Sequence, residues 1–77
     1  MKTPTRMFLI RHGQVVNYEN GAYNGHRDVD ITAYGVRQME AVAERLKREP
    51  LTGVYCSDLT RARRGAEIVA APHGLIP

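Results

Sequence analysis

The sequence predicts an α/β fold, in which helices pack against a mainly parallel sheet, because two short apolar runs alternate with two amphipathic segments. The apolar runs are residues 7–10 (MFLI) and 53–56 (GVYC), and a helical pattern follows each of them. A continuous apolar run bounded by polar residues indicates a strand buried on both faces, as in a parallel sheet. The order strand, loop, helix, strand, helix then predicts a parallel pair joined by a right-handed crossover.

The first predicted strand ends at the sequence Arg11-His12-Gly13, which opens a long polar segment. Residues 13–30 are rich in Gly, Asn and Asp and have no helical period, so we expect a loop there. Long ordered loops in compact domains are usually functional. The first helix is predicted to begin after Thr32, a good N-cap residue, and to end before Pro50. Its apolar stripe consists of Val36, Met39, Val42, Ala43 and Leu46.

The second helix is predicted directly after the second strand, with Ser57 or Asp58 as its N-cap. Residues 72–74 (PHG) are expected to end it. Cys56, the single cysteine, lies in the second predicted strand, where we interpret it as a small buried residue and not as a reactive thiol. The apolar stripe of this helix consists of Leu59, Ala62, Ala66 and Val69.

Length and charge limit the classes of function. A chain of 77 residues is at most one small domain, and domains of this size bury only about 60% of their unfolded surface. The net charge of +3 suits a small anionic substrate, and the tyrosines Tyr18, Tyr23 and Tyr34 form no periodic platform for nucleic acid bases. No apolar run approaches the ~20 residues of a membrane span, and none resembles a signal peptide. We therefore expect a soluble, cytoplasmic protein with neither a nucleic acid nor a membrane partner.

The residues at the ends of the two predicted strands point to phosphate chemistry. Carboxyl ends of parallel strands meet at one edge of a sheet, so Arg11 and His12 are expected on the same side as Arg61. A neutral imidazole is a good nucleophile toward phosphorus, and a neighbouring guanidinium disfavours the imidazolium form. The Arg11 guanidinium matches two phosphate oxygens, and Arg61 places a second cation at the positive end of a helix. Gly13 leaves room for the backbone to approach a ligand. Such a site requires neither a metal nor another cofactor.

Three segments, FLIRHGQ, NGHRDVDITAYGVRQ and VYCSDLTRARRGAEI, resemble in their order and spacing the histidine phosphatase superfamily, which includes phosphoglycerate mutases and phosphomonoesterases such as α-ribazole phosphatase. The resemblance implies that residues 1–77 are the N-terminal strand-loop-helix-strand-helix part of one phosphoglycerate mutase-like three-layer domain. It implies that His12 becomes phosphorylated and that Arg11 and Arg61 hold the phosphate. The remaining phosphate-binding candidates are Gly13, Asn17, Asn24 and Gly25.

The chain also departs from the family pattern. Gln14 stands where Glu is frequent, Asn17 lies one position early, and Gly65 replaces a usual Thr. Family members are more than twice as long, and their second half supplies a second catalytic histidine and the acid that protonates the leaving oxygen. We therefore expect a fragment that is inactive alone and that associates with its missing C-terminal half or with a second copy. The predicted function of the complete protein is hydrolysis of a small phosphomonoester through a phosphohistidine. The alternatives are a phosphoglycerate mutase-type phosphotransferase and a non-catalytic phosphate-binding module.

Overall fold

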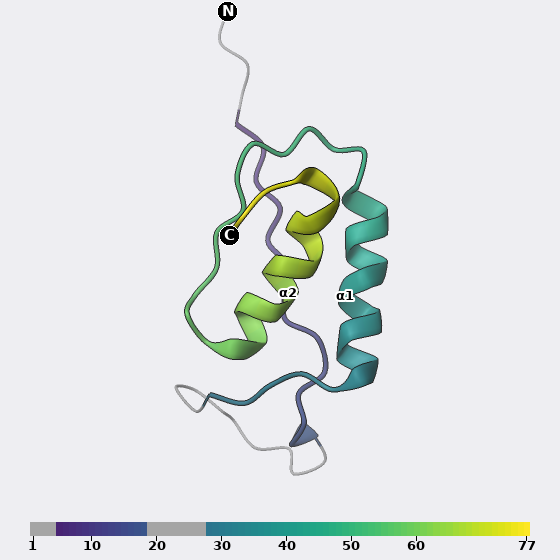
Figure 1. Ribbon diagram of the computed structural model, residues 1–77, viewed down its shortest axis with the longest axis vertical. Coiled ribbons are helices and arrows are strands. Elements are labelled where there is room, and N and C mark those ends of the chain that lie inside the picture. Colours follow the sequence, from purple (N-terminus) through teal and green to yellow (C-terminus); the bar gives the residue numbers. More distant parts are fainter. Residues whose placement is uncertain (1–4, 19–27) are drawn as a thin grey trace, which may run out of the picture.

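The computed structural model describes residues 5–18 and 28–77. Its helices are α1 (Ala33–Leu46) and α2 (Thr60–Ala70), which continues into the short 3-10 helix η2 (Ala71–His73). Figure 1 shows α1 and α2 side by side, running in the same direction, while the non-helical segments that precede them run in the opposite direction. This is the chain path that the alternating pattern of the sequence predicts.

The two predicted strands are not formed in the described part of the chain. Residues 7–10 and 53–56 are irregular. The one strand-like pairing among the described residues lies elsewhere, in an isolated antiparallel bridge between Val15 and Ile31. Leu9 is 89% exposed and Tyr55 is 93% exposed. Parallel strands are stable where both faces of the sheet are covered and their edges are paired. Because these apolar side chains face solvent, the described chain does not provide that environment.

Helix α1 follows the prediction closely. The Thr32 hydroxyl oxygen accepts a hydrogen bond from the Gly35 backbone N–H at 2.9 Å, so Thr32 is the N-cap. The helix ends at Leu46, before Pro50. Met39, Ala43 and Leu46 are buried, which confirms the face that the apolar spacing selects.

The N-cap predicted for α2 is wrong. Neither Ser57 nor Asp58 caps the helix, which begins at Thr60, and the Ser57 hydroxyl accepts only from the Leu59 N–H, at 3.4 Å. The cap comes instead from the distant Asp28, whose carboxylate accepts from the Thr60 backbone N–H at 2.6 Å and from the Thr60 hydroxyl at 3.0 Å. A contact across 32 residues leaves no local signal in the sequence.

The apolar stripe predicted for α2 is right only in part: Val69 is buried as expected, but Leu59, Ala62 and Ala66 are half-buried. Arg61, Gly65 and Val69 are buried at four-residue intervals. A Cβ atom on Gly65 would lie 2.8 Å from the terminal methyl of the Met39 side chain on α1. Glycine at this position therefore leaves room for the end of the Met39 side chain between α1 and α2. The core formed in this way consists of Val15, Ile31, Met39, Ala43, Leu46 and Val69.

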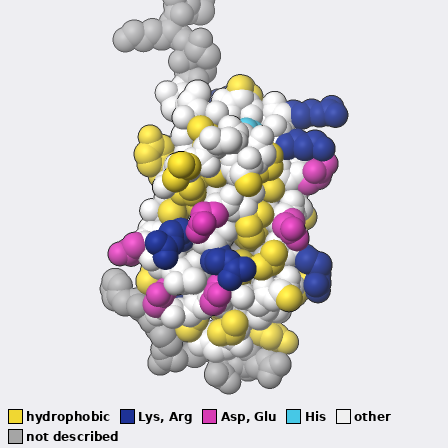
Figure 2. All heavy atoms as spheres, in the orientation of Figure 1, with side chains coloured by type: hydrophobic (Ala, Val, Ile, Leu, Met, Phe, Trp, Pro, Cys, Tyr) yellow, Lys and Arg dark blue, Asp and Glu magenta, His cyan; other side chains and the backbone are white. Residues whose placement is uncertain are grey.

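The C-terminal end of α2 behaves as expected. Gly74 ends η2 with a φ of 66°, a left-handed conformation that favours glycine. Cys56, in contrast, is exposed, because the segment that carries it has no strand partner to bury it. Figure 2 shows acidic and basic side chains interspersed with hydrophobic ones across the viewed face of the helices. Among the residues that the structure describes, no helix has the length and apolarity to cross a membrane.

Candidate phosphate-binding site

The His12 side chain is half-buried and held in one orientation by its neighbour. Its Nδ1 atom lies 2.8 Å from the Gly13 carbonyl oxygen. A carbonyl oxygen can only accept a hydrogen bond, so in the neutral ring Nδ1 carries the proton and donates it. The Nε2 atom then carries the lone pair. In its neutral form, His12 therefore presents the Nε2 lone pair that a nitrogen nucleophile needs.

The loop that follows His12 lies directly against the first turn of α1. A Cβ atom on Gly13 would lie 2.4 Å from the Gly35 carbonyl oxygen, and one on Gly35 would lie 2.4 Å from the Gln14 carbonyl oxygen. Both contacts are with backbone atoms, which cannot rotate away as a side chain can. The space beside Gly13, which the sequence assigns to a ligand, is therefore occupied on this side by the backbone of α1.

Gln14 fixes the same loop with hydrogen bonds from its backbone and its side chain. The Gln14 backbone N–H donates to the Gln38 side-chain carbonyl at 2.8 Å, and the Gln14 carbonyl accepts from the Thr32 N–H at 2.7 Å. The Thr32 hydroxyl donates to the Gln14 side-chain carbonyl at 2.8 Å. Sequence reasoning missed Gly35 and Gln38. The signal available in the sequence was a glycine three residues after the N-cap Thr32, followed three residues later by a polar side chain.

Arg61 occupies the first turn of α2, as the sequence predicts. It is 8% exposed, and of the described residues it is the one charged residue that is buried. A guanidinium keeps its charge when buried, and here it lies in the first turn of a helix, where the helix dipole favours an anion. Arg61 therefore adds a fixed positive charge to a positive helix end.

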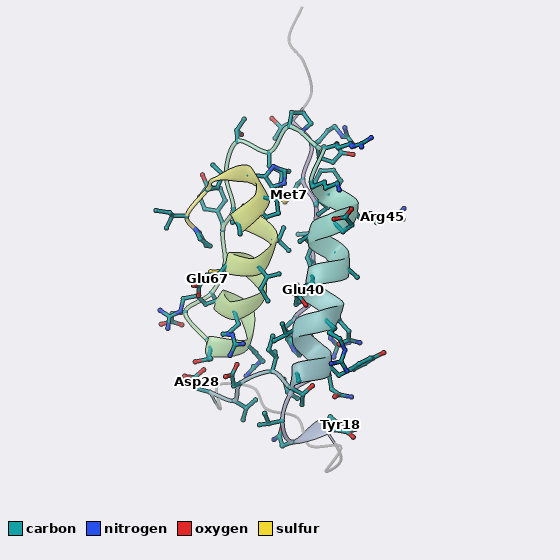
Figure 3. The ribbon with its side chains drawn as sticks, turned by 45° about the vertical axis from the view of Figure 1, so that its right-hand side comes forward. Met7, Tyr18, Asp28, Glu40, Arg45 and Glu67 are labelled. Carbon is teal, nitrogen blue, oxygen red and sulfur yellow. The ribbon has the colours of Figure 1, made fainter. Side chains whose placement is uncertain are left out.

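The two helix ends and the loop after His12 lie at the same end of the molecule. Figure 1 shows that α1 and α2 both begin there, and Figure 3 shows Tyr18 and Asp28 at that end, with Met7 at the other. Of the remaining predicted site residues, Arg11 is exposed and Asn17 is half-buried in a turn closed by the Tyr18 N–H and the Val15 carbonyl, 3.1 Å apart. Asn24 and Gly25 lie outside the described residues.

The Asp28 carboxylate is linked to this site through its hydrogen bonds with Thr60, the residue directly before Arg61. The hydrogen bonds from the Thr60 backbone N–H and hydroxyl hold the pKa of the Asp28 carboxyl below its ordinary value. The positive charges of Arg61 and Arg63 lower this pKa further. Asp28 is therefore an anion that stabilises the beginning of α2.

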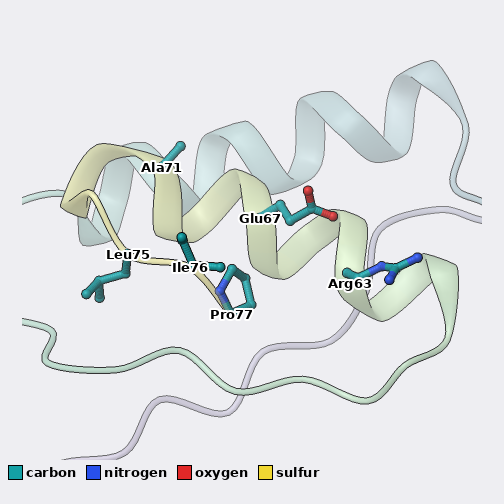
Figure 4. A pocket seen from close by; sticks show the side chains of 6 residues that line it. All are labelled: Arg63, Glu67, Ala71, Leu75, Ile76 and Pro77. Atoms are coloured by element: carbon teal, nitrogen blue, oxygen red, sulfur yellow. The ribbon is translucent and has the colours of Figure 1, made fainter.

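Two shallow hollows lie on the described part of the chain. The larger, of about 580 Å³, is drawn in Figure 4, and the smaller, of about 370 Å³, lies between α1 and α2. Neither is lined by His12 or Arg61. The side chains of the larger hollow come from α2 and the C-terminal segment: Arg63, Glu67, Ala71, Leu75, Ile76 and Pro77.

Comparison with known proteins gives one consistent result. The family model of the histidine phosphatase superfamily (branch 1) matches residues 7–77. The chain is 37% identical over 70 residues to the probable phosphoglycerate mutase GpmB of Yersinia enterocolitica, covering 91% of this chain and 33% of that protein. It is 36% identical over 64 residues to the adenosylcobalamin/alpha-ribazole phosphatase of Salmonella typhimurium, covering 83% of this chain and 32% of that protein.

A second probable phosphoglycerate mutase GpmB, from Proteus mirabilis, is 40% identical over 65 residues, covering 84% of this chain and 30% of that protein. The chain thus spans about a third of the length of these relatives. The match to the family model covers nearly the whole chain and includes every element described above. This chain therefore belongs to the histidine phosphatase superfamily.

Proposed function

We propose that the chain is the N-terminal, phosphate-binding part of a phosphomonoester hydrolase that works through a phosphohistidine at His12. The observation that carries this proposal is the hydrogen bond from His12 Nδ1 to the Gly13 carbonyl, which leaves the lone pair on Nε2. In this reaction Nε2 attacks phosphorus, and the bond from phosphorus to the ester oxygen breaks. Water then attacks the phosphohistidine, which releases inorganic phosphate and restores the neutral imidazole.

The cationic groups have a separate role in this mechanism. As the phosphoryl group is transferred, negative charge is spread over its three equatorial oxygens. Arg61, buried at the beginning of α2, and Arg11, beside the nucleophile, stabilise that charge. We assign Gly13 and Asn17, which lie in the loop after His12, to the phosphate pocket. We assign Asn24 and Gly25 to the same pocket on the family pattern.

The leaving alkoxide needs a proton, which a general acid must supply. We propose that this acid and a second histidine lie in a further segment of the protein, since the relatives are about three times as long as this chain. That segment would cover the exposed apolar side chains of residues 7–10 and 53–56. With that cover the two segments become strands of a mainly parallel sheet, as in an α/β domain. A second copy of the chain is the alternative cover.

A phosphoglycerate mutase-type phosphotransferase is the second candidate, because two of the relatives above carry that name. We favour the hydrolase because Gln14 and the residues after it differ from the RHGESxWN sequence usual in mutases. Both candidates form the same phosphohistidine and differ in the acceptor, which is water in a hydrolase and a second hydroxyl in a mutase. We place the protein in the cytoplasm, acting on a small phosphorylated substrate.

Turnover of a general phosphomonoester such as p-nitrophenyl phosphate by the full-length protein tests this proposal. We expect His12→Ala to lower the rate by on the order of 10³-fold, because the nucleophile is lost. His73→Ala is the matched control, since His73 is also half-buried but follows α2 at the far end of that helix. Equal rates for wild type and His12→Ala would refute the role of His12.

Two further measurements on the full-length protein, with a phosphorylated hydroxy acid and with orthovanadate, separate the alternatives. A mutase releases little inorganic phosphate and moves the phosphoryl group between hydroxyls of a phosphorylated acid. A non-catalytic module binds orthovanadate, a phosphate analogue, without turnover of either kind of substrate.

A further inference from the structure

Residues 28–32 connect the loop that carries His12 to the helix that carries Arg61. On one side, this segment pairs with the loop through the Val15–Ile31 bridge. Two backbone hydrogen bonds hold it there: the Val16 N–H donates to the Asp30 carbonyl at 3.0 Å, and the Thr32 N–H donates to the Gln14 carbonyl at 2.7 Å. The attachment begins only two residues after His12.

On its other side, the segment reaches α2. The Asp28 carboxylate accepts both donors of Thr60, the backbone N–H at 2.6 Å and the hydroxyl at 3.0 Å. Asp30 also forms an ion pair with Arg64, with 2.8 Å between the charged atoms, but both side chains are 43% exposed. Ion pairs this exposed contribute little. Asp28 is also exposed, but its two hydrogen bonds both go to Thr60, the first residue of α2, so we take Asp28 as the attachment of the segment to the beginning of that helix.

The residue that Asp28 holds is the one directly before Arg61. Helix α2 has no cap of its own, because its N-cap position is Leu59, which has no polar side chain. A helix whose first N–H groups lack partners loosens in its first turn. Arg61 lies in that turn, so the direction of its side chain depends on the cap that Asp28 supplies.

From these contacts we infer that Asp28 is a positioning residue, which holds Arg61 at a fixed place relative to His12. Backbone hydrogen bonds link the loop after His12 to the segment 28–32. The Asp28 carboxylate then links that segment to Thr60, the residue before Arg61. This inference rests on the proposed function, since it concerns how the phosphate site is held together. Asp28 itself does not touch the phosphate; it acts on the site through Arg61.

Orthovanadate affinity of the full-length protein measures the effect. We expect Asp28→Ala to weaken binding by about fivefold to tenfold, the size expected for loss of an N-cap. Asp28→Asn should lie between Asp28→Ala and wild type, because its amide oxygen can still accept from the Thr60 N–H. Asp58→Ala is the control: it removes an exposed carboxylate two residues before Thr60 that does not cap α2, and it should stay within twofold of wild type.

A double-mutant cycle decides whether Asp28 acts through Arg61. In an Arg61→Ala background, Asp28→Ala should cause no further loss of vanadate affinity. An equal loss in both backgrounds would overturn the inference, because Asp28 would then act independently of Arg61. A loss in Asp58→Ala as large as in Asp28→Ala would also overturn it, since a carboxylate that does not cap α2 would then matter as much as the one that does.

The result also separates this inference from the proposed function. If the wild-type protein binds vanadate and forms phosphohistidine while the Asp28 variants match it, only the positioning role is refuted. If the wild-type protein does neither, the proposed function is refuted and the inference with it. Should Asp28→Ala not fold, Asp28→Asn carries the same comparison with a milder change.

Discussion

Gly13 and Gly35 meet backbone to backbone where the loop after His12 crosses the first turn of α1. A Cβ atom on Gly13 would lie 2.4 Å from the Gly35 carbonyl oxygen and 2.8 Å from the Gly35 Cα atom. Contacts this short leave no room for a side chain at either position. The orientation of His12, which depends on the adjacent Gly13 carbonyl, is thereby tied to the position of α1.

Two buried helical glycines give a matched pair of substitutions. Gly35→Ala should destabilise the protein by about 1–3 kcal/mol, because the new methyl meets the fixed backbone of Gln14. Gly65→Ala should be close to neutral: its methyl meets only the flexible end of Met39, and alanine favours a helix by about 1 kcal/mol over glycine. Urea unfolding of the two variants checks this. Equal losses would show that the backbone contact has no special role.

Gln38 offers a test of the hydrogen bond that holds the loop. Gln38→Leu removes the acceptor of the Gln14 N–H, while Gln38→Glu keeps an acceptor oxygen at the same reach. We expect the leucine variant to lose about 0.5–1.5 kcal/mol of stability, the net worth of a hydrogen bond, and the glutamate variant to lose less. Unfolding free energies rank the two. A glutamate variant no better than the leucine one would count against the hydrogen bond.

Arg61→Lys tests whether shape as well as charge matters at the phosphate. Lysine keeps the positive charge but lacks the planar fork that matches two oxygens. We expect phosphate or vanadate to bind more weakly by about 1.5–3 kcal/mol, the size of a hydrogen bond to a charged group. Titration of the full-length variant measures this. Wild-type affinity would mean that Arg61 does not contact the anion.

The Asp28 cap predicts a specific dependence of stability on pH. Hydrogen bonds from Thr60 lower the pKa of Asp28 in the folded protein below its ordinary value of 3.8. The unfolded chain therefore takes up a proton first as the pH falls, so this contribution to stability is complete above that range and is lost as the pH falls through the folded pKa. The difference in unfolding free energy between wild type and Asp28→Asn should be constant near neutral pH and shrink below about pH 4. A difference that does not change with pH would contradict the cap.

The sequence was most informative where structure depends on near neighbours. As predicted, α1 begins after Thr32 and ends before Pro50, and Arg61 lies in the first turn of α2. These features depend on capping, spacing and backbone chemistry within a few residues. Membership of the superfamily also confirms the α/β class in general terms.

Features that depend on distant partners were not predicted. Asp28 caps a helix that begins 32 residues later. Glycine is needed at position 35 because of the contact with Gly13 and Gln14, and not because of anything within α1 itself. The apolar runs at residues 7–10 and 53–56 have strand-like composition, but a strand requires neighbours to pair with and layers to cover it. Within the described residues these segments have neither, so the predicted parallel sheet stays a prediction.

Cys56 gives a direct measure of whether those segments become covered. In the chain alone its thiol is exposed. If a further segment of the protein completes the sheet around residues 53–56, the Cys56 thiol should react with a thiol reagent much more slowly in the full-length protein than in the 77-residue chain. Equal reaction rates would contradict burial of this segment in the complete domain.

We propose above that His12 carries the phosphoryl group during turnover. The most direct measurement is to mix the full-length protein with a phosphomonoester, quench in alkali, where phosphohistidine survives, and locate the phosphate by mass spectrometry of the peptides. We expect phosphate on the peptide that contains His12, and we expect it to be lost in His12→Ala and retained in His73→Ala. Phosphate on another residue, or turnover with His12 unmodified at every time point, would contradict it.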